Sequence, residues 1–137
     1  MIEDKIHLSR WDWTVVAYYE MSDKDVEHVI GTIEKTGISS MALREVRHHL
    51  RTMGLDGGLT YTNVRKRQTV MVIGKTSSPA QFYNTLDHEK GHVVQHISDY
   101  IGLDNNGEEK QYLAGKLAEN IYPSAVKLIC GCALGEE

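Results

Sequence analysis

The chain has 137 residues, a net charge of −4 and an apolar fraction of 41%, which together predict a single globular domain over residues 1–137. No apolar run approaches the roughly 18 residues of a membrane span, and the N-terminus lacks the basic and apolar regions of a secretory signal. With only two cysteines, Cys130 and Cys132, a disulfide framework is excluded. These features predict a cytoplasmic protein that does not bind a membrane.

The N-terminal part of the chain predicts one strand followed by two helices. Residues 11–20 are rich in aromatic and β-branched side chains, which favours a strand. A serine N-cap and an apolar stripe then predict a helix over residues 22–35, and the same features recur over residues 40–53.

A β-hairpin is expected next. The glycine pair at residues 57–58 marks a turn. Residues 59–63 and 69–74 read as two strands that flank a basic turn at residues 65–67.

A long amphipathic helix is predicted directly after the hairpin. Ser78 is a candidate N-cap, and Pro79 suits the first helical position. Apolar side chains recur at three- and four-residue steps, as they do along one buried helix face: Phe82, Leu86, Val93, Ile97 and Tyr100. Gly91 interrupts this helix at a cost of about 1 kcal/mol relative to alanine, which suggests the close approach of another backbone or of a substrate.

The C-terminal part predicts two further helices. Residues 104–107 form a turn cluster, after which a helix is expected from Glu108 to about Ile121. Pro123 is expected to break this helix. A short terminal helix is then expected over residues 124–131.

The long helix contains the sequence His88-Glu89-Lys90-Gly91-His92, an H-E-x-x-H motif. Residues four apart share one helix face, so His88 and His92 can bind one Zn²⁺ ion through neutral imidazole nitrogens. Glu89 projects from the adjacent side, where its carboxylate can act as a general base on a water bound to that metal. The motif therefore predicts a zinc metallopeptidase.

A catalytic zinc site needs a third protein ligand, and four residues are candidates. They are His96, Glu108, Glu109 and Glu119. His96 lies one turn beyond His92, too far along a straight helix to share the ion comfortably, so it better suits supporting a ligand or facing the substrate.

Glu109 is the preferred third ligand on a geometric condition. If the motif helix ends near residues 97–98, a wide loop brings Glu109 level with His92. If the helix instead continues to Ile101 and turns tightly, Glu119 is the level residue. Glu108 remains a further alternative.

The motif and its surroundings resemble a known family. His88 to His96 read H-E-K-G-H-V-V-Q-H, followed by E-K-Q-Y-L-A at residues 109–114 and by Pro123. This pattern, over about residues 68–123, is similar to the short zinc metallopeptidases of the ImmA/IrrE type. The resemblance implies a minimal zincin-like α+β domain, in which a small antiparallel sheet packs against the motif helix and further helices. It also implies zinc ligation by His88, His92 and Glu109, with Glu89 as catalytic base, and a protein or peptide substrate.

Several residues could assist this chemistry. A hydrogen-bond donor is needed for the oxyanion, and His96, Tyr112 and Tyr100 are the candidates. Asp99 could orient a ligand imidazole. The strand at residues 69–74 could align an extended substrate by backbone pairing.

A second interpretation starts from the charge distribution. Residues 40–75 hold seven Lys or Arg against two acidic residues. Arg44, Arg47 and Arg51 form a stripe on the expected second helix, which a non-catalytic regulatory or nucleic-acid-associated module could use. Because the whole chain is acidic, a solvated helix face is the favoured explanation, and nucleic acid is an unlikely partner. The sequence does not indicate an oligomeric state.

Overall fold

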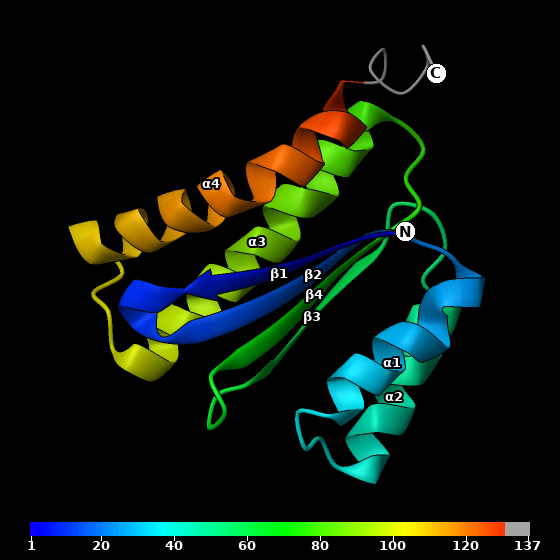
Figure 1. Ribbon diagram of the computed structural model, residues 1–137, viewed down its shortest axis with the longest axis horizontal. Coiled ribbons are helices and arrows are strands. Elements are labelled where there is room, and N and C mark those ends of the chain that lie inside the picture. The colour runs from blue at the N-terminus through cyan, green and yellow to red at the C-terminus, as the bar shows by residue number, and fades with distance from the viewer. Residues whose placement is uncertain (131–137) are drawn as a thin grey trace.

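The computed structural model describes residues 1–130 and shows an α+β fold (Figure 1). The last residue of the helix expected over residues 124–131, Gly131, and the second cysteine, Cys132, lie outside the described residues. Two short 3₁₀ turns, η1 (Ser9–Trp11) and η2 (Asp23–Asp25), accompany the main elements. Those elements are, in chain order, β1 (Ile2–Leu8), β2 (Trp13–Met21), α1 (Val26–Glu34), α2 (Ser40–Thr52), β3 (Gly58–Asn63), β4 (Gln68–Gly74), α3 (Pro79–Ile101) and α4 (Glu108–Ile129).

The four strands form one mixed sheet in the order β1-β2-β4-β3. β1 pairs with β2, and β3 with β4, in antiparallel register. β2 and β4 run parallel, because α1, α2 and β3 lie between them in the chain and form the crossover. The expectation of an antiparallel sheet is therefore corrected. The sequence did not predict β1, because this segment contains few strongly apolar residues among its exposed polar ones.

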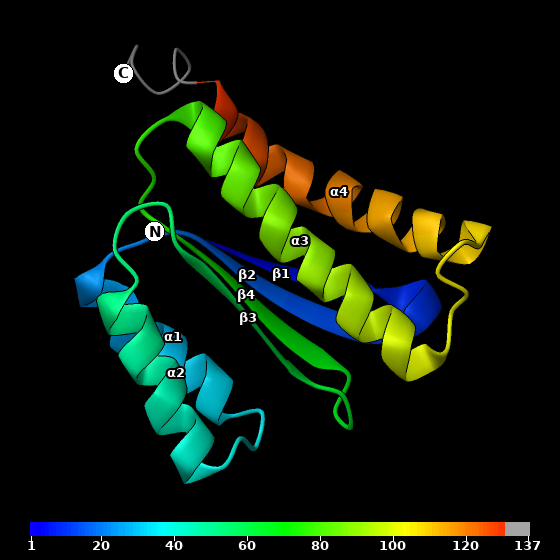
Figure 2. The same cartoon turned by 180° about the vertical axis from the view of Figure 1, so that it is seen from behind.

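Helices cover both faces of the sheet. α1 and α2 lie on one face, and α3 and α4 on the other (Figures 1 and 2). Each face has its own hydrophobic core, and alternate residues of the central strands contribute to each. The core under α3 and α4 includes Trp13, Val15, Ala17, Tyr19, Met71 and Ile73, and the core under α1 and α2 includes Tyr18, Met21, Val70 and Val72. Because both faces are buried, the central strands read as nearly continuous apolar runs.

The helix α3 begins where the sequence predicts. It ends at Ile101, the later of the two ends considered for the third-ligand geometry. The Ser78 side chain accepts a hydrogen bond from the Gln81 amide, and Pro79 is the first helical residue. The expected apolar stripe is confirmed, except that Tyr100 is 47% exposed. Gly102 ends the helix in the left-handed conformation, with φ +87°, and its amide donates to the Ser98 carbonyl. An end near residues 97–98 therefore does not occur, and the geometric condition on which Glu109 was preferred over Glu119 is not met.

The helix α4 is continuous from Glu108 to Ile129, so the expected break at Pro123 is wrong. Pro123 is exposed, and the carbonyl that loses its amide partner can bind water instead. The opposite face packs Leu117, Ile121 and Leu128 into the core, which keeps the helix together.

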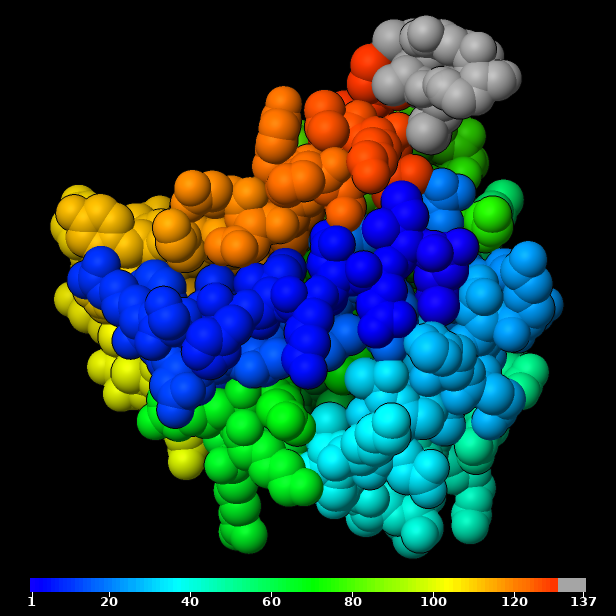
Figure 3. Space-filling model, in the orientation of Figure 1, coloured from blue at the N-terminus to red at the C-terminus, as the bar shows by residue number. Residues whose placement is uncertain are grey.

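β1 forms one edge of the sheet and lies on the surface between α4 and α1 (Figure 3).

In residues 1–130, no helix combines the length and the apolar composition that crossing a membrane requires.

Candidate active site

The two motif histidines converge on one point beside α3. The Nε2 atoms of His88 and His92 lie 3.1 Å apart, and their rings meet edge to face with centroids 4.7 Å apart. Two nitrogens bound to one tetrahedral zinc at 2.0–2.1 Å lie about 3.3 Å from each other. Both side chains are exposed. The pair therefore has the donor atoms and the spacing to supply two ligands to one Zn²⁺ ion.

Glu89 turns from this pair towards the sheet and is only 6% exposed. Its Oε1 accepts a hydrogen bond from Thr60 Oγ1 on β3 at 2.7 Å. Gly58, on the same face of β3, has no room for a side chain, since a Cβ there would lie 2.8 Å from Glu89 Oε2. The glutamate is thus held between α3 and the start of β3. The sequence did not indicate Thr60 or Gly58 as site residues, and Gly58, which was expected in a turn, is the first residue of β3.

The strand nearest to Glu89 is an edge strand. β3 pairs only with β4 among the described strands, whereas β4 lies between β2 and β3 and has both edges paired. Alignment of a substrate by residues 69–74, as expected from the sequence, is therefore excluded. β3 has the free edge, and His49 Nε2 lies 3.0 Å from the Gly58 carbonyl at its start.

Glu109 is held at a different place from the histidine pair. Its Oε1 accepts a hydrogen bond from Arg10 Nη2 at 2.6 Å, and its Oε2 accepts one from Trp11 Nε1 at 3.0 Å. Both carboxylate oxygens thus have donors from η1, at the end of β1. To bind a metal beside His92, Glu109 would have to exchange these partners.

The other acidic candidates do not join the pair either. Lys110 Nζ donates to Gln95 Oε1, which places the start of α4 beside Gln95. Glu119 pairs with Lys116 at 3.0 Å, and Glu108 is exposed at the first turn of α4. Within residues 1–130, no group of three or more His, Cys, Asp or Glu side chains is arranged to hold a metal ion.

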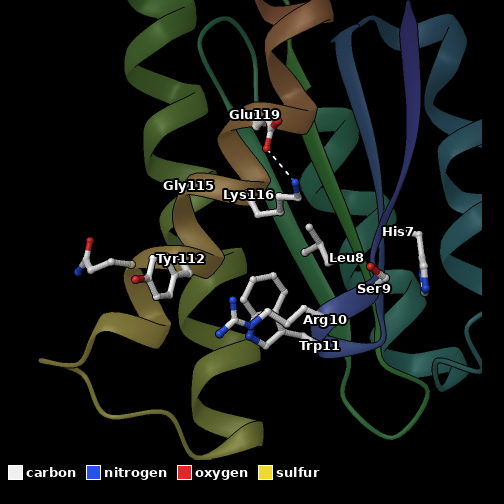
Figure 4. A pocket seen from close by; sticks show the side chains of 10 residues that line it. His7, Leu8, Ser9, Arg10, Trp11, Tyr112, Gly115, Lys116 and Glu119 are labelled. Carbon is white, nitrogen blue, oxygen red and sulfur yellow. Dashed lines mark hydrogen bonds and ion pairs between the residues drawn. The ribbon is translucent and has the colours of Figure 1, made fainter.

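A cavity of about 400 Å³ lies between the end of β1 and α4 (Figure 4). In it the Arg10 guanidinium carbon lies 5.5 Å from the Trp11 ring centroid and 5.3 Å from that of Tyr112. Tyr112 therefore faces Arg10. Arg10 and Lys116, the two cations of the wall, already have carboxylate partners in Glu109 and Glu119, so the cavity offers little attraction to a charged ligand.

The three remaining candidates lie at the C-terminal half of α3. His96 is half-buried, and its Nδ1 lies 2.9 Å from Thr62 Oγ1. Burial lowers the pKa of His96, a charge on His92 lowers it further, and Asp99 opposes both. Asp99 accepts a hydrogen bond from Gln95 Nε2, and Tyr100 stacks edge-on against the Trp13 ring.

The basic stripe on α2 is largely neutralised. Arg47 donates to Glu27 of α1 through Nε and Nη2, and Arg51 Nη2 donates to the same carboxylate at 2.6 Å. The hydrogen bond from Arg47 is the main reason why the pKa of Glu27 lies below its ordinary value. These two arginines therefore tie α2 to α1, which leaves Arg44 as the remaining cation of the stripe.

No protein-family model, curated protein or solved structure matches this chain. The similarity to ImmA/IrrE-type peptidases consequently stays a prediction from the motif.

Proposed function

We propose that the protein is a zinc metallopeptidase that hydrolyses peptide bonds of a protein partner. The observation that carries the proposal is the convergence of His88 Nε2 and His92 Nε2 at 3.1 Å, with the Glu89 carboxylate on the next position of the same helix. His88 and His92 would hold the zinc. Glu109 is kept as the proposed third ligand from the motif resemblance, although the early end of α3 that favoured it does not occur, and it would have to leave Arg10 and Trp11 to bind.

Glu89 is the proposed general base. Zinc, when bound, would lower the pKa of a coordinated water from its value in bulk water towards about 7. Glu89 takes a proton as the water oxygen bonds to the carbonyl carbon, and delivers it to the nitrogen as the C–N bond breaks. Thr60 occupies one lone pair of Oε1, which fixes the orientation of the carboxylate and leaves the other lone pairs for the proton.

The free edge of β3 is the proposed binding element for the substrate. An extended peptide that pairs with β3 gains backbone hydrogen bonds and runs past Thr60 and therefore past Glu89. Gly91 lies on the side of α3 away from Glu89, and a Cβ built there meets no atom within 4 Å. The close approach of another backbone that the sequence suggested at Gly91 is therefore not seen in the described chain.

Zinc content tests the proposal first. We expect one zinc per chain by elemental analysis of the wild-type protein, loss of zinc in His92→Ala, and weakened binding in Glu109→Ala. His48→Ala is the matched control, because His48 is an exposed histidine on α2. Protein without zinc after reconstitution at neutral pH would overturn the proposal.

Peptide hydrolysis tests it second. A mixture of random fluorescence-quenched hexapeptides serves as the probe. We expect cleavage by the zinc-loaded wild type and its loss in Glu89→Gln, with zinc content unchanged. Equal cleavage by the two proteins would exclude Glu89 as the base.

A further inference from the structure

A chain of hydrogen bonds crosses the sheet beneath α3 and ends at His96. The indole Nε1 of Trp13 donates to Thr69 Oγ1 at 2.9 Å. Thr69 Oγ1 lies 2.9 Å from Thr62 Oγ1. Thr62 Oγ1 in turn lies 2.9 Å from His96 Nδ1. These residues belong to β2, β4, β3 and α3, and together they are named the Trp13–His96 relay.

The chemistry of the first residue sets the direction of the relay. An indole N–H can only donate, so Thr69 Oγ1 is an acceptor towards Trp13. The Thr69 hydroxyl proton then needs an acceptor of its own, and Thr62 Oγ1 is the one in reach among the described residues. Once Thr62 accepts from Thr69, its own proton is available for His96 Nδ1, which lies 2.9 Å away. Each donor in this order has an acceptor.

The reverse order leaves a buried proton without a partner. If His96 Nδ1–H donated to Thr62, and Thr62 to Thr69, then Thr69 Oγ1 would accept two hydrogen bonds. The proton of the Thr69 hydroxyl would then have no acceptor in the described part of the chain. Thr69 is only 1% exposed, and an unsatisfied buried donor costs about 1–3 kcal/mol. The reverse order is therefore disfavoured. In a third order Thr62 accepts from both Thr69 and His96 Nδ1–H and turns its own proton to water in the open hollow that it lines, whereas the forward order keeps that proton in a hydrogen bond within the protein.

The position of His96 gives this order a functional consequence. In a neutral imidazole that accepts at Nδ1, the proton resides on Nε2. The ring lies one helical turn beyond His92, with 6.1 Å between the centroids. It also lines an open hollow of about 390 Å³ together with Thr62, Val64, Asp99 and Tyr100. A peptide along β3 can reach this hollow.

We infer that the relay fixes His96 as the Nε2–H tautomer and that this N–H donates a hydrogen bond to the scissile carbonyl oxygen as it gains negative charge. The second part rests on the proposed function. Since its Nε2 carries a proton, His96 does not offer that nitrogen to the metal, which separates its role from those of His88 and His92. The relay supplies the preorganisation that such a donor needs, because Thr62 holds the ring before the substrate arrives.

The tautomer can be measured without any activity. Two-bond ¹H–¹⁵N correlation spectra of the ¹⁵N-labelled zinc-loaded protein, recorded above pH 7.5, distinguish the two neutral tautomers, and the His96→Gln spectrum assigns the signal. We expect the Nε2–H pattern in the wild type and in Thr62→Ser, which keeps the hydroxyl. Thr62→Val removes the donor to Nδ1 and should give a mixture of tautomers. An Nδ1–H pattern in the wild type, or an unchanged pattern in Thr62→Val, would overturn the relay.

Kinetics test the role of the donor. On the hexapeptide that the wild type cleaves fastest, His96→Gln should lower kcat about 10²–10³-fold with zinc content unchanged. Thr62→Val should lower kcat less and leave KM nearly constant, and Thr62→Ser should restore it. Wild-type kcat in His96→Gln would overturn the inference and leave the proposed function standing. A zinc-loaded wild type without activity would overturn the proposed function, and the spectra alone would then decide the relay.

Discussion

The hydrogen bond between Thr60 and Glu89 makes a quantitative prediction about stability. Thr60→Val has nearly the same shape as the wild type but removes the donor to Glu89 Oε1, which lies 2.7 Å away. Glu89 is 6% exposed, so water cannot fully replace the lost donor. A hydrogen bond to a charged group contributes about 1.5–3 kcal/mol. For 137 residues the unfolding entropy is about 0.29 kcal/mol/K, and we therefore expect Tm to fall by about 5–10 °C.

A double-mutant cycle isolates this interaction from other effects of the valine. Urea unfolding followed by circular dichroism gives the free energy of unfolding of the wild type, Thr60→Val, Glu89→Leu and the double variant. We expect a coupling energy of about 1–2 kcal/mol, because Thr60→Val removes no partner once Glu89 is replaced. Thr60→Ser, which keeps the hydroxyl, is the matched control and should stay close to the wild type. A coupling energy below about 0.5 kcal/mol would refute the reasoning.

Four further substitutions test single positions. Gly58→Ala should destabilise the protein by about 1–3 kcal/mol, since its Cβ would meet Val72 O at 3.0 Å and also the Glu89 carboxylate. Gly91→Ala has nothing near its Cβ and should instead stabilise the protein by up to about 1 kcal/mol. The opposite ranking of the two variants in urea unfolding would contradict the packing described. Asp25→Ala removes the capping partner of the Ser22 amide, which holds the pKa of Asp25 below its ordinary 3.8. Because the folded state binds the Asp25 proton more weakly, the stability from this cap is present above pH 3.8 and disappears as the pH falls through the folded pKa. The variant should therefore lose about 1 kcal/mol of unfolding free energy at pH 7 and almost nothing near pH 2. A loss of stability that does not change with pH would exclude the cap. Pro123→Ala should raise the free energy of unfolding by about 1–3 kcal/mol by restoring an amide donor within α4, and an unchanged urea midpoint would show that the proline imposes no strain.

Local signals in the sequence predicted the helices well because those signals act over a few residues. The sequence left Ser39 and Ser40 as alternative caps of the second helix, and Ser39 is the one that caps α2. The Ser78 N-cap, the proline at the start of α3 and the spacing of Phe82 and Leu86 are also confirmed. The same range of interaction places His88 and His92 on one face, so their convergence followed from a separation of four residues.

Local signals misled where the outcome depended on distant packing. Pro123 is a helix breaker by itself, yet α4 continues through it because the buried face of the helix packs on the sheet and on α3. β1 pairs with β2 and completes the sheet, although its own composition is weak for a strand. The parallel pairing of β2 with β4 joins residues separated by two helices and a strand, and no local pattern encodes such a pairing.

The same distinction between local signals and distant packing applies to the candidate site. The sequence by itself determined the two histidines, the neighbouring glutamate and the helix that carries them, since one helical turn fixes all three. Only the tertiary structure decided that Glu89 contacts Thr60, that Glu109 contacts Arg10, and that His96 terminates a relay from Trp13. These partners lie between 29 and 99 residues apart in the chain, and the folding of the sheet against α3 and α4 is what brings them together.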